Sequence, residues 1–276
     1  MTIKKILKGN KYIYPLLKFV RKIQKIILPN FIFNVNKILR VNGIYRNSQY
    51  EKLKTLKDKH KGERCFIVGT GPSLIIQDLD KLRNEVTFSM NSIFLAFDET
   101  EWRPNYYGVQ FPDFYSKYKS EIDHLDVEYK FVGDVISKQN KLSNEYYIYP
   151  LNLLNHTWHH QKYHTKFSED AFAVIYDGYT ITYSLLQLAV YLGFVEIYLI
   201  GVDCNYSSNT NNHFKDYGVV DPLAFAAGEK MISAFKEAKK YADRHGIKIY
   251  NATRGGMLEI FERVDLDNVF SEENVV

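Results

Sequence analysis

The sequence predicts an α/β protein with a Rossmann-like, mostly parallel sheet that carries helices on both faces. Two observations lead to this class. Strand-like and helix-like segments alternate from about residue 61 onward, and the strand-like segments 64–69 and 196–203 are apolar along almost their whole length. A strand that is apolar on both faces belongs in a sheet that helices cover on both sides. A basic segment before residue 61 predicts, in addition, a helical arm outside this domain.

The expected elements follow one another in the order that a parallel sheet requires. Short apolar runs predict strands over 64–69, 86–91, 105–110, 129–135, 146–151, 196–203 and 247–253. Helical periodicity and start signals predict helices over 72–82, 112–122, 179–192 and 221–245, and Gly193 and Gly246 stop the last two. We therefore divide the chain into an arm, 1–60, and a Rossmann-like catalytic domain, 61–276, with a lid-like insertion at about 150–178.

The arm is basic and amphipathic. It contains many Lys and Arg and no Asp or Glu from Met1 to Arg46, and its apolar residues recur mostly every three or four positions: Leu16, Leu17, Phe19, Val20, Ile23, Ile26 and Ile27. This composition predicts a helix that lies on an anionic membrane surface. Packing of the helix on the protein's own core is the alternative. The wide apolar face argues against a nucleic-acid partner.

The chain shows no signal peptide and no apolar run long enough for a transmembrane helix. Its two cysteines, Cys65 and Cys204, lie far apart in sequence, as is common in a reducing compartment. We expect a cytoplasmic protein that is peripheral at the inner face of the cell membrane. The oligomeric state stays open, with a homo-oligomer as one alternative.

Ligands of parallel sheets bind outside the carboxyl ends of the strands. The expected strands end in small or amide-bearing residues: Gly69, Thr70, Gly71, Ser73, Asn91, Gln110, Gly201 and Asp203. Such residues suit a polar ligand better than a metal ion. The turn "GTGPS" has two readings. Its glycines and Ser73 either hold a phosphate at a helix N-terminus, or they form a tight turn with Ser73 as an N-cap.

His213 is the candidate general base. It lies on a long polar loop, 201–214, that leaves an expected central strand, and imidazole suits proton abstraction near neutral pH. An exposed histidine without a catalytic task is the alternative. The chain has no D-x-D after a buried strand and no H-E-x-x-H pattern, so we expect neither a metal site nor a cofactor.

Three segments carry a resemblance to known enzymes: "FIVGTGPSL", "FSMNSIF" and "YTITYSLLQLAVYLGFVEIYLIGVD". They resemble the bacterial CMP-sialic acid transferases of glycosyltransferase family 42. They are also similar to the broader DUF115 group of capsule and lipopolysaccharide cluster proteins, which includes relatives of an archaeal hydroxymethylpterin pyrophosphokinase. The similarity covers roughly Arg64 to Asp203.

The resemblance implies nucleotide contacts at matching positions, namely Gly71, Ser73, Asn91, Thr180, Gly201 and Asp203, with Gly69 in the same turn and Gln110 near another amide position. Thr70 stands where the family has Asn, and Gly178 stands where the transferases have Arg. His213 is similar in placement to the catalytic His. Tyr206 and Tyr217 loosely match tyrosines that assist phosphate departure.

The resemblance implies a metal-independent, inverting glycosyltransferase. It would move a sialic acid-like sugar from a CMP-sugar donor to a glycan or glycolipid acceptor in surface polysaccharide synthesis. One alternative is a pterin pyrophosphokinase-like diphosphotransferase, which would need magnesium and clustered acids. Another is a non-catalytic nucleotide-binding protein of a polysaccharide cluster.

Overall fold

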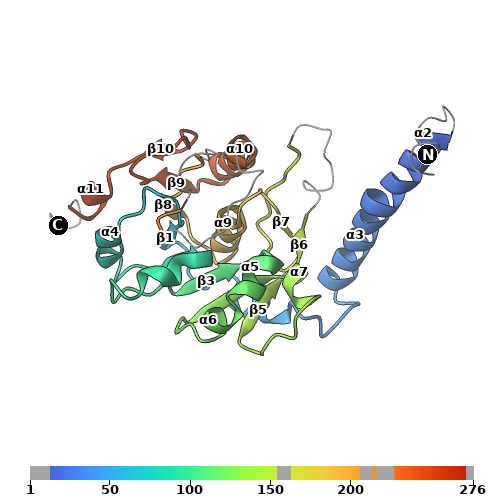
Figure 1. Cartoon of the computed structure of the whole chain (residues 1–276), viewed down its shortest axis with the longest axis horizontal. Helices are drawn as coiled ribbons and strands as arrows, with labels where there is room; N and C mark the ends of the chain where they lie inside the picture. Colours follow the sequence, from blue (N-terminus) through green and yellow to red (C-terminus); the bar gives the residue numbers. More distant parts are fainter. Residues whose placement is uncertain (1–12, 154–162, 206–212, 216–226, 272–276) are drawn as a thin grey trace, which may run out of the picture.

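A central parallel sheet organises the protein. The computed structural model describes residues 13–153, 163–205, 213–215 and 227–271. Eight strands lie in the order β10-β9-β8-β1-β2-β3-β4-β5, and each neighbouring pair is parallel (Figure 1). The strands are β1 Arg64–Val68, β2 Thr87–Met90, β3 Tyr106–Val109, β4 Tyr129–Gly133, β5 Tyr146–Tyr149, β8 Glu196–Ile200, β9 Lys248–Asn251 and β10 Glu262–Arg263. The predicted fold class is confirmed.

Alternate residues of the buried strands enter two separate cores. Cys65 and Ile67 of β1 pack on one face, toward the long helices α9 and α10, whereas Phe66 and Val68 pack on the other face. That second face is covered by shorter helices and by the C-terminal α11. The helices of the domain are η2 Glu51–Leu56, α4 Ile76–Lys81, η3 Asn91–Ala96, α5 Pro112–Lys117, α6 Lys119–Asp123, α7 Asp134–Ser137, α9 Ile181–Tyr191, α10 Ala227–His245 and α11 Leu266–Ser271.

The expected elements occur, with differences at their ends. Helix α9 ends before Gly193, whose φ of +96° is a conformation that favours glycine. The helix after β1 begins at Ile76, not in the "GTGPS" turn, and the cap position falls on Ile75. A two-stranded sheet of β6 Leu151–Asn152 and β7 Ile175–Tyr176 was not predicted, because strands of two residues leave no periodic pattern. Part of the insertion expected at about 150–178, namely 154–162, lies outside the described residues.

The order of strands changes direction at β1, which is the switch point of the sheet. Strands β2 to β5 extend the sheet on one side of β1, and β8 then pairs on the other side. The pairing runs from Arg64 opposite Glu196 to Val68 opposite Ile200, so β1 and β8 end level with each other. Ligands of open parallel sheets bind at such a switch point.

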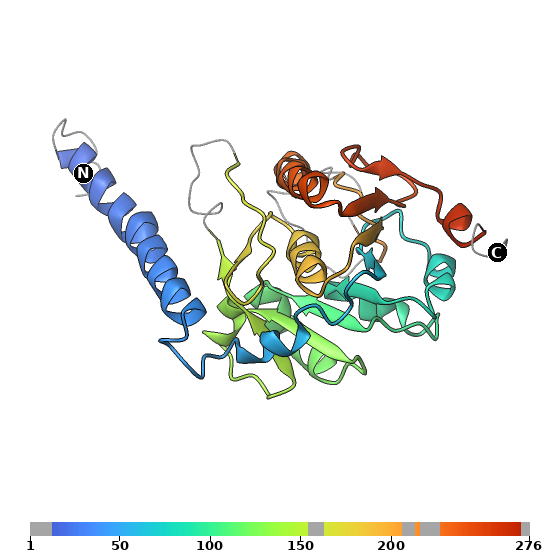
Figure 2. The ribbon, with the colours of Figure 1, turned by 180° about the vertical axis from the view of Figure 1, so that it is seen from behind.

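The arm is helical and stands away from the sheet, as Figures 1 and 2 both show. It consists of α2 Ile13–Lys22, the π-helical η1 Ile23–Ile27 and α3 Leu28–Val41. The arm predicted from the sequence was given as 1–60, but Leu53 and Leu56 of η2 are buried in the core of the domain. Within the described residues, no helix is both long enough and apolar enough to cross a membrane.

Candidate functional site

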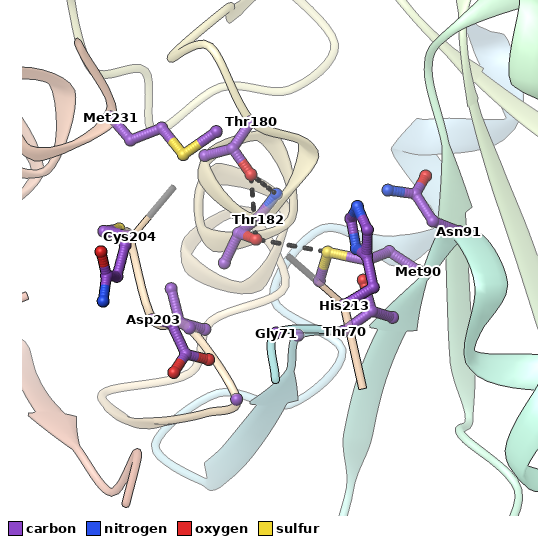
Figure 3. Close-up of a pocket in the computed structure, with 14 residues that line it drawn as sticks. Thr70, Gly71, Met90, Asn91, Thr180, Thr182, Asp203, Cys204, His213 and Met231 are labelled. Atoms are coloured by element: carbon purple, nitrogen blue, oxygen red, sulfur yellow. Dashed lines mark hydrogen bonds between the residues drawn. The ribbon is translucent and has the colours of Figure 1, made fainter. Parts of the chain in front are cut away.

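A pocket lies where the turns after β1, β2 and β8 meet the start of α9. The space between its walls, including the open solvent at its mouth, is about 500 Å³. The structure brings eight sequence-predicted residues to its wall: Gly69, Thr70, Gly71, Asn91, Thr180, Gly201, Asp203 and His213. Met90, Thr182, Val202, Cys204, Asn205 and Met231 complete the lining (Figure 3).

The two glycines of the first turn make room for the chain itself. A Cβ on Gly69 would stand 2.5 Å from the carbonyl oxygen of Gly201, and a Cβ on Gly71 would stand 2.6 Å from the same oxygen. The Cβ on Gly71 would also overlap the Asp203 carboxylate. The N–H groups of Gly69 and Gly71 donate to Ile200 O (2.7 Å) and Gly201 O (2.9 Å). The glycines therefore allow the β1 and β8 turns to pack together, and the reading of "GTGPS" as a phosphate-binding turn stays a prediction.

Ser73 is held by Asp203. Its hydroxyl donates to Asp203 Oδ2 at 2.8 Å, and its backbone N–H points at the same oxygen at 3.4 Å. Ser73 is absent from the pocket wall and does not cap α4. A carboxylate thus occupies the position beside the turn where a phosphate was expected. Asp203 itself reaches the pocket and is the one carboxylate on its described wall.

Strained backbone gathers around this pocket. Five non-glycine residues of the described chain have a positive φ, and three of them are Asn91 (46°), Tyr179 (65°) and Cys204 (51°). Asn91 and Cys204 line the pocket, and Tyr179 precedes the lining residue Thr180. Such conformations cost about 1–3 kcal/mol each and cluster at functional sites. The backbone geometry therefore supports the same location as the topology.

Asn91 follows β2 directly and presents its amide to the pocket. Its side-chain Oδ1 is buried and has no hydrogen-bond partner among the described residues. A buried acceptor without a partner is costly, at roughly 1–3 kcal/mol. This acceptor is therefore suited to a hydrogen-bond donor on a bound ligand.

The N-terminus of α9 opens into the pocket. Thr180 is the N-cap, and its hydroxyl accepts from the N–H of Thr182 at 3.3 Å. The hydroxyl of Thr182 lies 3.3 Å from the sulfur of Met90, as Figure 3 shows. The first turn of this eleven-residue helix carries the positive end of the helix dipole. This end suits an anionic part of a ligand.

His213 lies on the opposite side of the pocket from α10. It lines the same pocket as Asn91 and Met90, which Figure 3 also labels. The short described segment around it is tied down, because Phe214 N–H donates to Thr70 O at 3.0 Å and Lys215 Nζ donates to Leu95 O at 2.7 Å. The expected phosphate-assisting residues Tyr206 and Tyr217 lie outside the described residues.

Gln110 lies away from the pocket wall. It is buried at the end of β3, where its amide accepts from Ser184 Oγ (2.7 Å) and donates to Asp177 Oδ1 (3.2 Å). Its polar atoms are engaged inside the domain. The structure therefore places Gln110 among the groups that support α9, at a distance from the other candidates.

Cys204 is part of the wall but is a poor nucleophile. Burial, together with the nearby Asp203 carboxylate, raises the pKa of its thiol to about 12. The thiol is therefore protonated at neutral pH. Sequence reasoning missed Met231, which comes from α10, because nothing local relates it to the strand ends. The two threonines of "YTIT" could have indicated Thr182 as a second site residue beside Thr180.

The donor set on the described wall does not resemble a metal centre. The described residues contain no group of three or more His, Cys, Asp or Glu that could hold a metal ion. What the wall offers is one carboxylate, two amides, an imidazole, hydroxyls and backbone N–H groups. This combination can bind sugar hydroxyls, a base edge and a phosphate.

The fold and the pocket define a Rossmann-like α/β protein with its site at the switch point of a parallel sheet. The chain belongs to the MptE-like family, whose model, described as "6-hydroxymethylpterin diphosphokinase MptE-like", matches residues 41–209. This match confirms the resemblance to the DUF115 group. No curated protein matches the chain.

Two solved structures are similar in fold. One is the MAf glycosyltransferase from Magnetospirillum magneticum AMB-1, with 16% identity and a TM-score of 0.51 over 76% of this chain. The chain spans 35% of the length of that protein. The other is the sialyltransferase CstII from Campylobacter jejuni, in complex with CMP-3FNeuAc, with 17% identity and a TM-score of 0.41 over 73% of this chain and 86% of the other.

Proposed function

We propose that the protein is a glycosyltransferase that binds the nucleotide of a CMP-sugar donor in this pocket. The donor carries a sialic acid-like sugar, and the acceptor is a glycan or glycolipid of a surface polysaccharide. The observation that carries the proposal is Asn91: a left-handed residue at a strand end, with a buried acceptor that lacks a partner among the described residues. Cytosine offers an amino donor that this acceptor can bind.

The charges around the pocket favour a singly phosphorylated leaving group. A monophosphate needs fewer compensating donors than a diphosphate, and the α9 N-terminus with Thr180 can provide them without a divalent ion. The Asp203 carboxylate suits ribose hydroxyls, because its Oδ2 already accepts from Ser73 and its charge would repel a phosphate. This assigns the phosphate to α9 and the ribose to the β8 turn.

The transfer step requires one base. The acceptor hydroxyl attacks the anomeric carbon while the bond from that carbon to the phosphate oxygen breaks, and CMP leaves with the bonding electrons. His213 accepts the hydroxyl proton, and attack opposite the phosphate inverts the anomeric centre. Tyr206 and Tyr217 remain candidates for assisting the phosphate.

A variant of the base separates catalysis from binding. We expect His213→Ala to lower the transfer rate by about 100-fold or more, with little change in CMP affinity. His124→Ala, an exposed histidine next to α6, is the matched control. If His213→Ala retains full transfer, His213 is not the base. If the wild type binds nucleotide but transfers nothing, the non-catalytic alternative holds.

The family match favours a second candidate, a diphosphotransferase that acts on a small alcohol such as a pterin. Such an enzyme moves a diphosphate from a nucleoside triphosphate and usually requires magnesium to neutralise the phosphates. It predicts tight ATP binding that EDTA abolishes. The single carboxylate on the described wall argues for the first candidate.

A thermal-shift panel distinguishes the two candidates. CMP, CDP, UDP, GDP and ATP are each added with EDTA and, separately, with magnesium. We expect CMP with EDTA to stabilise the protein, by about 2.7 kcal/mol at a hundred times its dissociation constant. A preference for UDP or GDP would overturn the choice of donor, and magnesium-dependent stabilisation by ATP alone would favour the diphosphotransferase.

A further inference from the structure

The arm exposes a stripe of apolar side chains. Of the eighteen large hydrophobic side chains that are exposed in the described chain, thirteen lie between Ile13 and Tyr45. Three of them, from the end of the π-helical η1 onward, are spaced by four and seven residues and therefore share one side of the helix. These residues, which we call the arm stripe, are Ile27, Phe31 and Ile38.

The stripe side chains are 46–65% exposed. Another side of the arm, with Ile26, Pro29 and Phe33, forms a cleft with Leu151 and Leu153. The base of the arm is fixed to the domain through Arg40, which is 4% exposed. Its guanidinium donates to Phe172 O (3.0 Å) and Ala173 O (2.7 Å) and stacks on Tyr50. The domain therefore contacts another side of the arm, and the stripe side chains stay exposed in the part of the chain that the structure describes.

The charge of the arm decides what covers the stripe. Residues 1–46 contain eleven Lys and Arg and no Asp or Glu. Two arms that paired along their stripes would bring like charges together without any acidic partner to offset them, unlike a coiled coil with pairs across its interface. An anionic lipid surface supplies both an apolar interior and negative charge.

We propose that the arm stripe inserts into an anionic membrane leaflet and that the Arg40 contacts hold the catalytic domain at a fixed orientation to that surface. Lys18 and Arg21 are exposed on α2 of the same arm, and their long side chains can reach lipid headgroups. This inference is independent of the donor and of the reaction.

Vesicle co-sedimentation of the full chain tests the proposal. We expect binding to vesicles that contain phosphatidylglycerol, weak binding to pure phosphatidylcholine, and a loss of binding at high salt. The double variant Ile27→Ser/Phe31→Ser should lose binding. Its matched control is Val195→Ser/Met257→Ser, which changes two exposed apolar residues of the domain and should bind as the wild type does.

Charge reversal of basic residues provides a second, independent test of membrane binding. Lys18→Glu/Arg21→Glu should weaken binding to anionic vesicles roughly tenfold or more, whereas Lys236→Glu/Lys248→Glu in the domain should change it little. Circular dichroism and thermal unfolding check that every variant is folded.

Three outcomes would overturn the proposal. The wild type fails to bind anionic vesicles, or the stripe variant binds as well as the wild type does. In the third, the wild type does not bind vesicles, and sedimentation equilibrium shows that it self-associates whereas the stripe variant does not. The stripe is then an interface between two copies of the chain. None of these outcomes alters the nucleotide panel, so each is distinguishable from a failure of the proposed function.

Discussion

Asn91 allows stability and binding to be separated with one substitution. Its φ of +46° is costly for a side chain and free for glycine. We expect Asn91→Gly to keep or raise the melting temperature, while CMP affinity falls roughly tenfold because a buried hydrogen bond to the ligand is lost. Differential scanning fluorimetry and titration calorimetry measure the two effects. A variant that binds CMP as the wild type does would remove Asn91 from the site.

Gly71 tests the packing of the two turns. A methyl group there overlaps the Asp203 carboxylate and stands 2.6 Å from Gly201 O, which is backbone and cannot turn aside. We expect Gly71→Ala to reduce the free energy of unfolding by about 1–3 kcal/mol, as overpacking usually does. Urea unfolding measures this.

The control for Gly71 is Gly255→Ala. A Cβ on Gly255 would meet no atom within 4 Å. This variant should be as stable as the wild type or slightly more stable, because alanine restricts the unfolded chain. Equal stability of Gly71→Ala and Gly255→Ala would contradict the packing described here.

Helix α4 is joined to the segment after β9 by an ion pair. Arg254 donates to both carboxylate oxygens of Asp78 at 2.7 Å, and Lys81 donates to Asp78 Oδ1 at 3.1 Å. Burial alone would raise the pKa of Asp78, but these bonds outweigh it and hold the pKa below its usual value. Arg254 belongs to the same segment as Met257, whose N–H donates to Asp203 O at 2.7 Å. The ion pair therefore helps to hold this segment against the β8 turn.

The lowered pKa of Asp78 gives a pH dependence with a definite sign. The stabilisation is complete above the unfolded pKa, which is about 4, and disappears as the pH falls through the lower folded value. We expect Asp78→Asn to cost roughly 1–3 kcal/mol at pH near 7 and much less at pH near 2. Urea unfolding at both pH values measures this. An unchanged cost in acid would contradict the account, and Asp243→Asn on α10 is the control.

The sequence predicted whole elements better than their contacts. β1 and β8 are buried on both faces, so their apolar runs identify them without ambiguity. The role of Gly71 could not be predicted, because a glycine pattern shows that space is needed but not whether a ligand or another segment fills it. The Asp203 carboxylate that fills it comes from 132 residues later in the chain. The contact of Ser73 with Asp203 could not be predicted for the same reason.

The molecule as a whole combines a rigid sheet edge with an exposed arm. The eight strands place three turns from distant parts of the sequence around one pocket. Of the ten described residues that were predicted as site residues, eight lie on its wall, and Ser73 and Gln110 do not. The topology rule succeeds because it depends on strand direction alone, which apolar patterning already determines.

A crystal structure of the protein with CMP, grown in EDTA, tests the central claim most directly. We expect the cytidine beside Asn91, the ribose at the Asp203 turn and the phosphate at the N-terminus of α9. A nucleotide bound elsewhere, for example in the cleft between the arm and Leu151–Leu153, would contradict the account.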